Sequence, residues 1–249
     1  MALRILLSND DGVNAPGLKA VARELRAIGD LMIVAPMSDQ SGVSHSLTIT
    51  RPLRIKRHDS KVYSVDGTPT DCMTIAMHEI LKRPPQVVVS GINHGPNMGE
   101  DVHYSGTVAA AIEGTIMGIP SIAASMTAPD HDGRAFRSAA KFLRRLVPRI
   151  IGRIPKGTLL NVNFPALPKG GYRQYQITRL GHRTYTDIIS AKRDPRGREY
   201  FWIGGEPTWD RIKDTDAAAV GKGIVSISPM NIDMTDSELL EQMRQWKLR

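Results

Sequence analysis

The sequence predicts an α/β fold in which most strands of the sheet are parallel. Short runs of consecutive apolar residues, typical of strands buried on both faces, alternate with segments whose apolar residues recur at helical spacing. The length of 249 residues, with hydrophobic residues at 41% and charged residues at 23%, suits one folded domain of this class. We therefore expect a single domain over residues 1–249, with the core and the active site in residues 1–165.

The first part of the chain predicts a strand, a helix and a second strand. Residues 3–8 form an apolar run that stops at Asn9, and residues 31–35 form another that stops at Pro36. Between them, residues 18–28 carry apolar side chains at the spacing of one helix face. Strands joined in this way by helices build a three-layer, Rossmann-like fold.

The middle of the chain resumes this alternation after an interruption. Residues 48–65 predict an antiparallel hairpin at the edge of the sheet, because charges are interleaved with short apolar stretches. The elements expected to follow are the helix 70–81, the strand 86–90, the helix 107–117 and the strand 120–125.

The alternation ends after a basic amphipathic helix at 136–151 and a strand at 159–162. Residues 171–205 are polar, β-prone and rich in arginine, so we expect a protruding hairpin arm that packs on another subunit. Residues 223–249 then predict a returning strand at 224–227 and a terminal helix at 236–246.

The composition limits the classes of protein to which the chain can belong. Its only cysteine, Cys72, excludes an internal disulfide and a multi-cysteine zinc site. No apolar stretch approaches membrane-spanning length and the first residues lack a secretory signal, so we expect a soluble, unprocessed, cytoplasmic protein. The formal net charge of +8 indicates anionic partners, although the scattered basic clusters are also typical of solvated surfaces.

Three loops after predicted strands carry the candidate catalytic residues. Ligands of open parallel sheets bind beside the carboxyl ends of the strands, and all three loops are rich in oxygen ligands. Asp10 and Asp11 directly follow the first strand, where repulsion between adjacent carboxylates favours a bound cation. A turn or a helix cap formed by the same pair is the alternative interpretation.

The second loop, residues 39–46, offers serine hydroxyls, and the third, residues 90–99, leads through Ser105, Gly106 and Thr107 into an alanine-rich helix. A helix start presents unpaired amides and a partial positive charge, so a phosphate group would bind there. A surface turn and a capped core helix are the alternatives for these two segments. His45 is interpreted as a hydrogen-bonding loop residue, because no second His or Cys lies at zinc-ligand spacing.

The donor set determines the expected metal and reaction. Oxygen ligands favour magnesium or manganese over zinc or copper. A cation held by two carboxylates and neutral oxygens neutralises phosphoryl charge and lowers the pKa of a water molecule. The loops therefore predict metal-assisted phosphate hydrolysis, in which Asp10 or Asp11 accepts the proton of the attacking water. Attack by Asp10 itself, through an acyl-phosphate, is the rival mechanism.

These loops, in this order, resemble the SurE family, the stationary-phase survival proteins that act as 5′- and 3′-nucleotidases. The resemblance covers nearly the whole chain. It rests on the co-linear motifs RILLSNDDGVNAPGL, SGVSHSLT, GTPTDC at 67–72, VVVSGINHGPNMG, YSGTVAAAIEG, DPRG at 194–197, YFWIG and TDAAAVGKGIVSISPM.

The resemblance implies divalent-metal-dependent hydrolysis of nucleoside 5′- and 3′-monophosphates, and in some members of short polyphosphate. It also implies a homodimer or homotetramer that exchanges C-terminal hairpins and helices. One Mg²⁺ or Mn²⁺ ion per subunit would be held by Asp10, Asp11, Ser41 and Asn93. Contacts to the substrate would fall on Asn9, Asn97, Ser105, Gly106 and Thr107.

Three other classes of function are alternatives to this one. A haloacid-dehalogenase-like phosphatase needs two aspartates separated by one residue, whereas Asp10 and Asp11 are adjacent. A nucleic-acid-binding module would account for the charge of +8, but no nucleic-acid motif is present, so no stable nucleic-acid partner is expected. The third class is a stress-induced assembly protein with a vestigial site.

Overall fold

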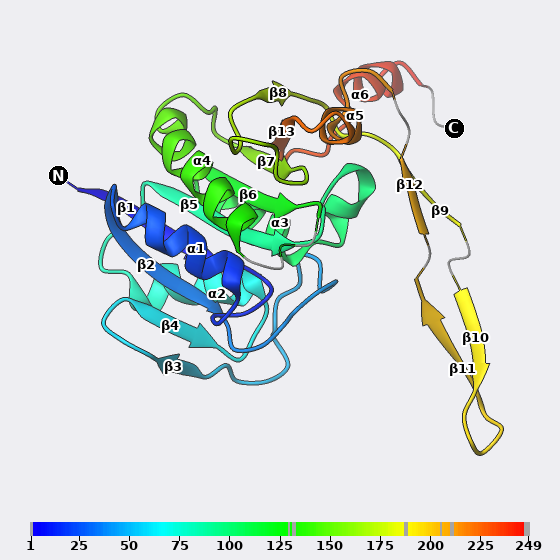
Figure 1. The fold of residues 1–249 in the computed structure, drawn as a ribbon, viewed down its shortest axis with the longest axis horizontal. Coiled ribbons are helices and arrows are strands. Elements are labelled where there is room, and N and C mark those ends of the chain that lie inside the picture. Colours follow the sequence, from blue (N-terminus) through cyan, green and yellow to red (C-terminus); the bar gives the residue numbers. More distant parts are fainter. Residues whose placement is uncertain are drawn as a thin grey trace.

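The computed structural model describes residues 2–128, 130, 133–186, 189–204, 206–209 and 212–246. Nine strands form one sheet in the order β3-β4-β2-β1-β5-β6-β7-β13-β8, and helices cover both of its faces (Figure 1). This is the predicted three-layer α/β arrangement. No helix in the described part of the chain is both long and apolar enough to cross a membrane.

Six neighbouring strands of the sheet run parallel, from β4 to β7. Their bounds are β4 Val62–Val65, β2 Gly29–Pro36, β1 Leu3–Ser8, β5 Val87–His94, β6 Ser121–Met126 and β7 Thr158–Phe164. The apolar runs that predicted β1, β2, β5, β6 and β7 therefore correspond to central strands. The predicted edge hairpin is present as β3 Ile55–Arg57 paired antiparallel with β4, while β4 also joins β2 in parallel.

Central strands are buried on both faces because helices pack on each side of the sheet. In β1, Ile5 and Leu7 contact the core beneath α1 Pro16–Leu25 and α4 Arg134–Ile150. Leu6, between them, faces the core beneath α2 Pro69–Ile75 and α3 Gly106–Ile116. Figure 1 shows α1 and α4 side by side on one face. The period-two alternation of a strand thus serves two separate cores.

Local signals set where the helices begin. Pro16 opens α1 at a position where a missing amide proton is tolerated. Thr68 and Asp71 form a reciprocal capping box at the start of α2, and the predicted helix 70–81 continues past α2 as a π-helical turn, Ala76–Ile80. Ser105 caps α3 by accepting a hydrogen bond from the Val108 amide at 3.1 Å.

The structure extends β5 beyond the predicted end at residue 90. The strand continues to His94 with a register shift between Gly91 and Asn93, so half of the expected glycine-rich loop is sheet edge. A Cβ atom on Gly91 would lie 2.2 Å from the carbonyl oxygen of Ala124, so only glycine fits beside β6 here. A 3₁₀ turn, Gly99–His103, then leads to α3.

The C-terminal part returns to the sheet and sends out an arm. The strands β8 Tyr175–Ile177 and β13 Val225–Asn231 pair with each other in parallel, and β13 pairs antiparallel with β7. The short helix α5 Asp216–Gly221, which the sequence pattern did not predict, precedes β13, and α6 Ser237–Met243 forms the expected terminal helix.

The arm predicted at 171–205 is present, with different limits. It consists of two antiparallel pairs, β9 Arg183–Thr186 with β12 Glu206–Trp209 and β10 Ile189–Arg193 with β11 Glu199–Ile203. Figure 1 shows it projecting away from the sheet. It begins later than predicted because β8 belongs to the sheet. Residues 187, 188 and 205 of the predicted arm, and 247–249 of the predicted C-terminal part, lie outside the described residues.

The base of the arm is bonded to the segment that leads into α3. Glu100 accepts from the Arg183 amide at 2.8 Å and pairs with His182, while Asp101 pairs with the Arg183 guanidinium. The buried carboxylate of Asp216, in α5, accepts from the amides at positions 99 and 181 at 2.9 and 2.8 Å. These contacts fix the arm base and the 3₁₀ turn together.

Candidate active site

The candidate site lies where the loops after β1, β2 and β5 meet the start of α3. In the sheet, the chain runs from β1 to β2 on one side, and after β4 it crosses to place β5 on the other side of β1, so the strand order reverses at β1. The carboxyl edge at such a switch point is where open parallel sheets bind ligands. The residues after β1 and at the end of β5 are therefore brought together as predicted from their order in the sequence.

Asp10 is held against the first turn of α3. Its side chain is 3% exposed, and its carboxylate accepts hydrogen bonds from the Thr107 amide at 2.9 Å and from the Thr107 hydroxyl. Burial raises the pKa of Asp10 above its ordinary value, against the lowering effect of the bonds from Thr107. Each carboxylate oxygen has a second lone pair, so Asp10 can still ligate a cation.

Gly106 makes this approach of Asp10 to α3 sterically feasible. A Cβ atom at position 106 would lie 2.9 Å from the Asp10 Cβ and 3.1 Å from its Oδ2. The Thr107 amide is used by Asp10 and the Val108 amide by the Ser105 hydroxyl, so the Gly106 amide is the open donor of this turn. The contact of Thr107 with phosphate stays a prediction, since both of its donors point to Asp10.

Asp11 is half-buried beside Asp10. Its Oδ2 accepts from the His94 amide at 3.3 Å, which connects the first loop to the end of β5. Burial and the neighbouring Asp10 charge raise the pKa of Asp11 to about 6. Simultaneous ionisation of these two adjacent carboxylates is costly, and a bound cation would lower that cost.

The second loop is tied to the first by backbone contacts. The Gln40 amide donates to the Asp10 carbonyl at 2.9 Å, and Gly12, at a φ of 95°, allows the turn to lie close to Ser38. Ser41 donates both its amide and its hydroxyl to Asp39 Oδ1, at 2.7 and 2.6 Å. The hydroxyl proton of Ser41 is thereby fixed on Asp39, and its lone pairs remain available to a ligand.

Asp39 is a third carboxylate of this region that sequence reasoning did not assign. Its charge contributes to the raised pKa values of both Asp10 and Asp11, which shows that it lies near them. Within the described chain, however, no three His, Cys, Asp or Glu side chains form a group suited to a metal. A cation here would therefore need neutral oxygens as well as carboxylates.

Asn93 and Asn9 offer such oxygens. Asn93 lies at the end of β5 and donates from Nδ2 to the Gly95 carbonyl at 3.0 Å, which fixes the orientation of its amide. Asn9 is fully buried and donates to the Gly12 carbonyl at 3.0 Å. Its Oδ1 is buried without a hydrogen-bond partner among the described residues. Such an acceptor is costly unless a ligand or solvent satisfies it.

Asn97 is held by polar side chains of β6 and β7. The backbone amide of Asn97 donates to Asn163 Oδ1 at 3.0 Å, and its side-chain Nδ2 donates to Ser125 Oγ at 2.7 Å. Its carbonyl accepts from Asn161 at 2.8 Å and from Asn163 at 2.9 Å. Sequence reasoning missed these supports, although two asparagines at alternate positions of an otherwise apolar strand were a signal for a polar cluster.

The second loop also closes over the start of α3. His45 Nε2 pairs with Glu113 Oε2 at 2.8 Å, which agrees with the interpretation of His45 as a hydrogen-bonding residue. Ser44 donates its hydroxyl to the His103 carbonyl at 2.6 Å and its amide to the Tyr104 carbonyl at 3.1 Å. The loop that carries Ser41 is thus held against the segment that carries Ser105.

Comparison with known proteins identifies the family. Residues 5–187 match the family model described as Survival protein SurE. The chain belongs to the SurE family. Relatives named 5′-nucleotidase SurE include those of Geobacter sulfurreducens, at 45% identity over 99% of this chain and 94% of the relative, and Vibrio campbellii, at 47% over 98% and 94%.

A solved SurE structure has the same fold. The crystal structure of the SurE protein from Aquifex aeolicus is 40% identical, with a TM-score of 0.86 over 96% of this chain and 98% of that chain. The agreement extends over almost the whole chain, so the membership of the SurE family applies to the C-terminal elements as well as to the sheet.

Proposed function

We propose that this chain is a divalent-metal-dependent phosphatase that hydrolyses nucleoside 5′- and 3′-monophosphates, and also short polyphosphate. Its relatives in the SurE family, at 42–47% identity, carry the name 5′-nucleotidase, and the chain is an enzyme of this hydrolase class. The single observation that carries the proposal is the position of two adjacent carboxylates, Asp10 bonded to the N-terminal turn of α3 and Asp11 bonded to the end of β5.

The proposed cofactor is one Mg²⁺ or Mn²⁺ ion per subunit, held by Asp10, Asp11, Ser41 and Asn93. These residues fit such an ion because all four offer oxygen and because the Ser41 hydroxyl and the Asn93 amide are already oriented. Burial and, after it, the neighbouring Asp10 charge raise the pKa of Asp11, and a bound cation would offset both effects. When bound, the cation neutralises charge on the phosphoryl group and makes a water molecule more acidic.

The residues of the chain divide the remaining work. Asp11, which is half-buried and accepts a hydrogen bond from the His94 amide, is proposed to accept the proton of the attacking water. The burial of Asp10 and its two bonds from Thr107 favour a holding role over nucleophilic attack on phosphorus. Trapping of an acyl-phosphate on Asp10 would reverse this assignment.

The phosphate group is proposed to bind at the start of α3. Gly106 lies beside Asp10, and Ser105 caps the same helix end, where the helix dipole favours negative charge. Asn97 is oriented by its buried partners, and Asn9 carries an unsatisfied carbonyl oxygen. Thr107 positions Asp10 through its two hydrogen bonds, and we propose that it also contacts the substrate.

Assembly into a homodimer or homotetramer is proposed through the arm and the terminal helix. Large apolar side chains on both are solvent-exposed in the single chain, up to 86% at Ile203, which is unusual for a surface that stays uncovered. The exposed residues of the arm and of the C-terminal segment include Ile189, Phe201, Trp202, Leu239, Met243 and Trp246. We expect no stable nucleic-acid partner, and we place the protein in the cytoplasm.

The decisive experiment measures phosphate release from a panel of nucleoside 5′- and 3′-monophosphates, with Mn²⁺ or with chelator. We expect release that requires the metal, and absence of release from every substrate would rule out the proposal. Asp10→Asn should reduce kcat/KM by about a hundredfold or more, because one carboxylate of the cation site is lost. Its circular dichroism spectrum should match the wild type, and unchanged turnover would remove Asp10 from the site.

A further inference from the structure

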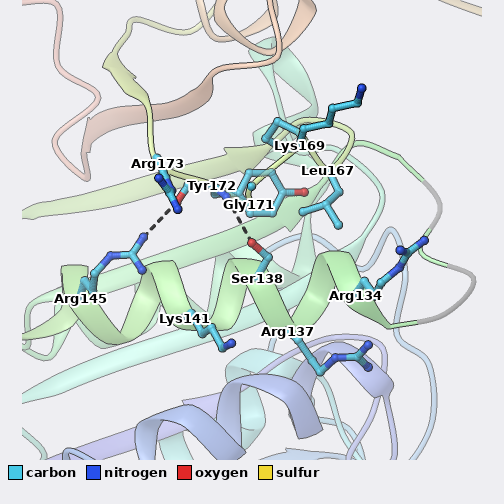
Figure 2. Close-up of a pocket in the computed structure, with 12 residues that line it drawn as sticks. Arg134, Arg137, Ser138, Lys141, Arg145, Leu167, Lys169, Gly171, Tyr172 and Arg173 are labelled. Carbon is cyan, nitrogen blue, oxygen red and sulfur yellow. Dashed lines mark hydrogen bonds between the residues drawn. The ribbon is translucent and has the colours of Figure 1, made fainter.

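An open groove runs along α4, between this helix and the segment that follows β7 (Figure 2). Its volume is about 930 Å³, and none of its described lining residues belongs to the candidate active site. Six of these residues are basic and none is acidic. We call this feature the basic groove, and its cations are Arg134, Arg137, Lys141, Arg145, Lys169 and Arg173.

The cations of the basic groove lie on two facing elements. Four recur every three or four residues on α4, from Arg134 to Arg145, and Lys169 and Arg173 lie on the segment across the groove (Figure 2). A helix rise of about 1.5 Å per residue places Arg134 and Arg145 roughly 16 Å apart. Lys141, Lys169 and Arg173 form no ion pair with any residue that the structure describes.

The wall opposite α4 is fixed by buried contacts. The Tyr172 hydroxyl donates to the Pro165 carbonyl at 2.7 Å, and its ring packs on Phe164 with centroids 5.0 Å apart. The Tyr172 amide donates to Ser138 Oγ at 3.2 Å, and Arg145 donates to the Tyr172 carbonyl at 3.0 Å. The groove is therefore formed before any ligand binds, which lowers the entropy lost on binding.

Arrangement and charge together determine the class of ligand. We propose that the basic groove binds a small anion that carries several phosphate groups, at a site separate from the catalytic one. Guanidinium groups hold phosphate oxygens through paired hydrogen bonds, and ammonium groups attract them as point charges. The Ser138 hydroxyl, which accepts from Tyr172, keeps its own proton to donate to such an anion.

The dimensions and the lining exclude simpler anions. One phosphate group offers too little charge and too few oxygens to pair with cations on both elements, whereas a chain of three or more offers more of each. A single-stranded nucleic acid is disfavoured because its bases need aromatic rings on which to stack, and the one ring among the described lining residues, Tyr172, is 3% exposed. The volume is also in the usual range of small-molecule sites.

Calorimetric titration of the full chain tests the proposal. The protein is kept in chelator, so that no cation bridges the probe to Asp10 and Asp11. The probes are inorganic triphosphate, a nucleoside triphosphate, orthophosphate and a short single-stranded RNA. We expect one triphosphate per chain, much weaker binding of orthophosphate, and an affinity that falls with salt. Equal affinity for the two triphosphates supports recognition of the phosphates alone, and tighter binding of the nucleotide assigns the site to nucleotides.

Two charge-matched triple variants locate the binding. Lys141→Gln/Lys169→Gln/Arg173→Gln removes three exposed cations of the groove and should weaken triphosphate binding at least about tenfold. The control Lys56→Gln/Lys82→Gln/Arg83→Gln removes three exposed cations elsewhere and should bind as the wild type does. Both should release phosphate from nucleoside monophosphates at the wild-type rate.

Three outcomes would overturn the proposal. Equal losses in the groove and control variants would show a nonspecific effect of net charge. Unchanged binding in the groove variant would place triphosphate elsewhere, for example at the start of α3. Binding of the RNA more tightly than triphosphate, with loss in the groove variant, would make the groove a nucleic-acid site. Circular dichroism of both variants checks that the fold is retained.

Discussion

Replacing Gly106 by alanine tests the contact between Asp10 and α3 with a single methyl group. The added Cβ would lie 2.9 Å from the Asp10 Cβ and 3.1 Å from a Pro69 ring carbon, whereas nonbonded carbons prefer about 3.5–4.0 Å. Asp10 or the start of α3 must therefore move by roughly 0.6–1 Å. The substitution acts directly on the position of the proposed metal ligand.

The expected effect is larger on activity than on stability. A displacement of about 1 Å at a catalytic group costs up to about a hundredfold in rate, so kcat/KM should fall about ten- to a hundredfold. Overpacking costs about 1–3 kcal/mol, and the better helix propensity of alanine returns up to about 1 kcal/mol. The free energy of unfolding should therefore fall by no more than about 3 kcal/mol.

The assay is phosphate release from a nucleoside monophosphate over a Mn²⁺ titration, with urea unfolding in parallel. We expect a weaker apparent affinity for Mn²⁺ and a urea-unfolding transition that stays cooperative. Gly221→Ala is the matched control, because a Cβ there meets no atom within 4 Å and should leave activity unchanged. Activity of Gly106→Ala within twofold of the wild type would refute the steric argument.

Three further predictions concern the supports of the site. Because the pKa of Asp11 is raised to about 6, Mn²⁺ affinity should be high above that pH and fall as the pH drops through it. The metal-free protein should behave in the opposite way, because the folded state holds the Asp11 proton more tightly than the unfolded state does. It should lose roughly 1–2 kcal/mol of stability as the pH rises from about 4 to 6, after discounting for exposure. Asn163→Leu removes a donor and an acceptor of buried Asn97, and should destabilise by about 2–4 kcal/mol and raise KM. Asp216→Asn leaves one acceptor for the amides at 99 and 181, and should destabilise by about 2–3 kcal/mol.

Each of these has a distinct measurement and a contrary result. Calorimetry between pH 5 and 8 measures Mn²⁺ affinity, and a pH-independent affinity would contradict the Asp11 assignment. Urea unfolding and KM values test Asn163→Leu, and unfolding that is indistinguishable from the wild type would show that the asparagine cluster is not structural. Thermal unfolding tests Asp216→Asn, for which an unchanged Tm would mean that solvent replaces the lost acceptor.

The sequence was sufficient for the parts of the fold that depend on local pattern. The apolar runs of β1 and β2 needed no tertiary information, because burial on both faces leaves no polar alternation. The predicted end of β5 at residue 90 was wrong. Glycines at 91 and 95 predict a loop, whereas the close approach of β6 keeps Asn93 and His94 in the sheet. β8 has only three residues, Tyr175–Ile177, too few to show a strand pattern, and their pairing with β13 makes them a strand.

The candidate site, like the fold, was predicted only in part from the sequence. Asp10 and Asp11 were predicted from their position after β1, whereas Ser41 as a ligand was implied by the resemblance to the SurE family, and the topology brings the two loops to one edge. Asp39 and Asn163 were not identified, because one acts through a bond to Ser41 and the other through Asn97. The Asp39–Ser41 bond is local but depends on the conformation of its loop, and the alternating asparagines of β7 indicate a polar cluster without identifying Asn97 as its partner.

The bonds at the root of the hairpin arm have a mechanical consequence. Through Glu100 and Asp216, the arm is rigidly coupled to the stretch that ends at Ser105. A displacement of the arm would therefore strain the turn before α3, where substrate is proposed to bind. In the proposed assembly, docking of another chain on the arm would therefore affect the proposed phosphate site, and dilution should alter KM before it alters the fold.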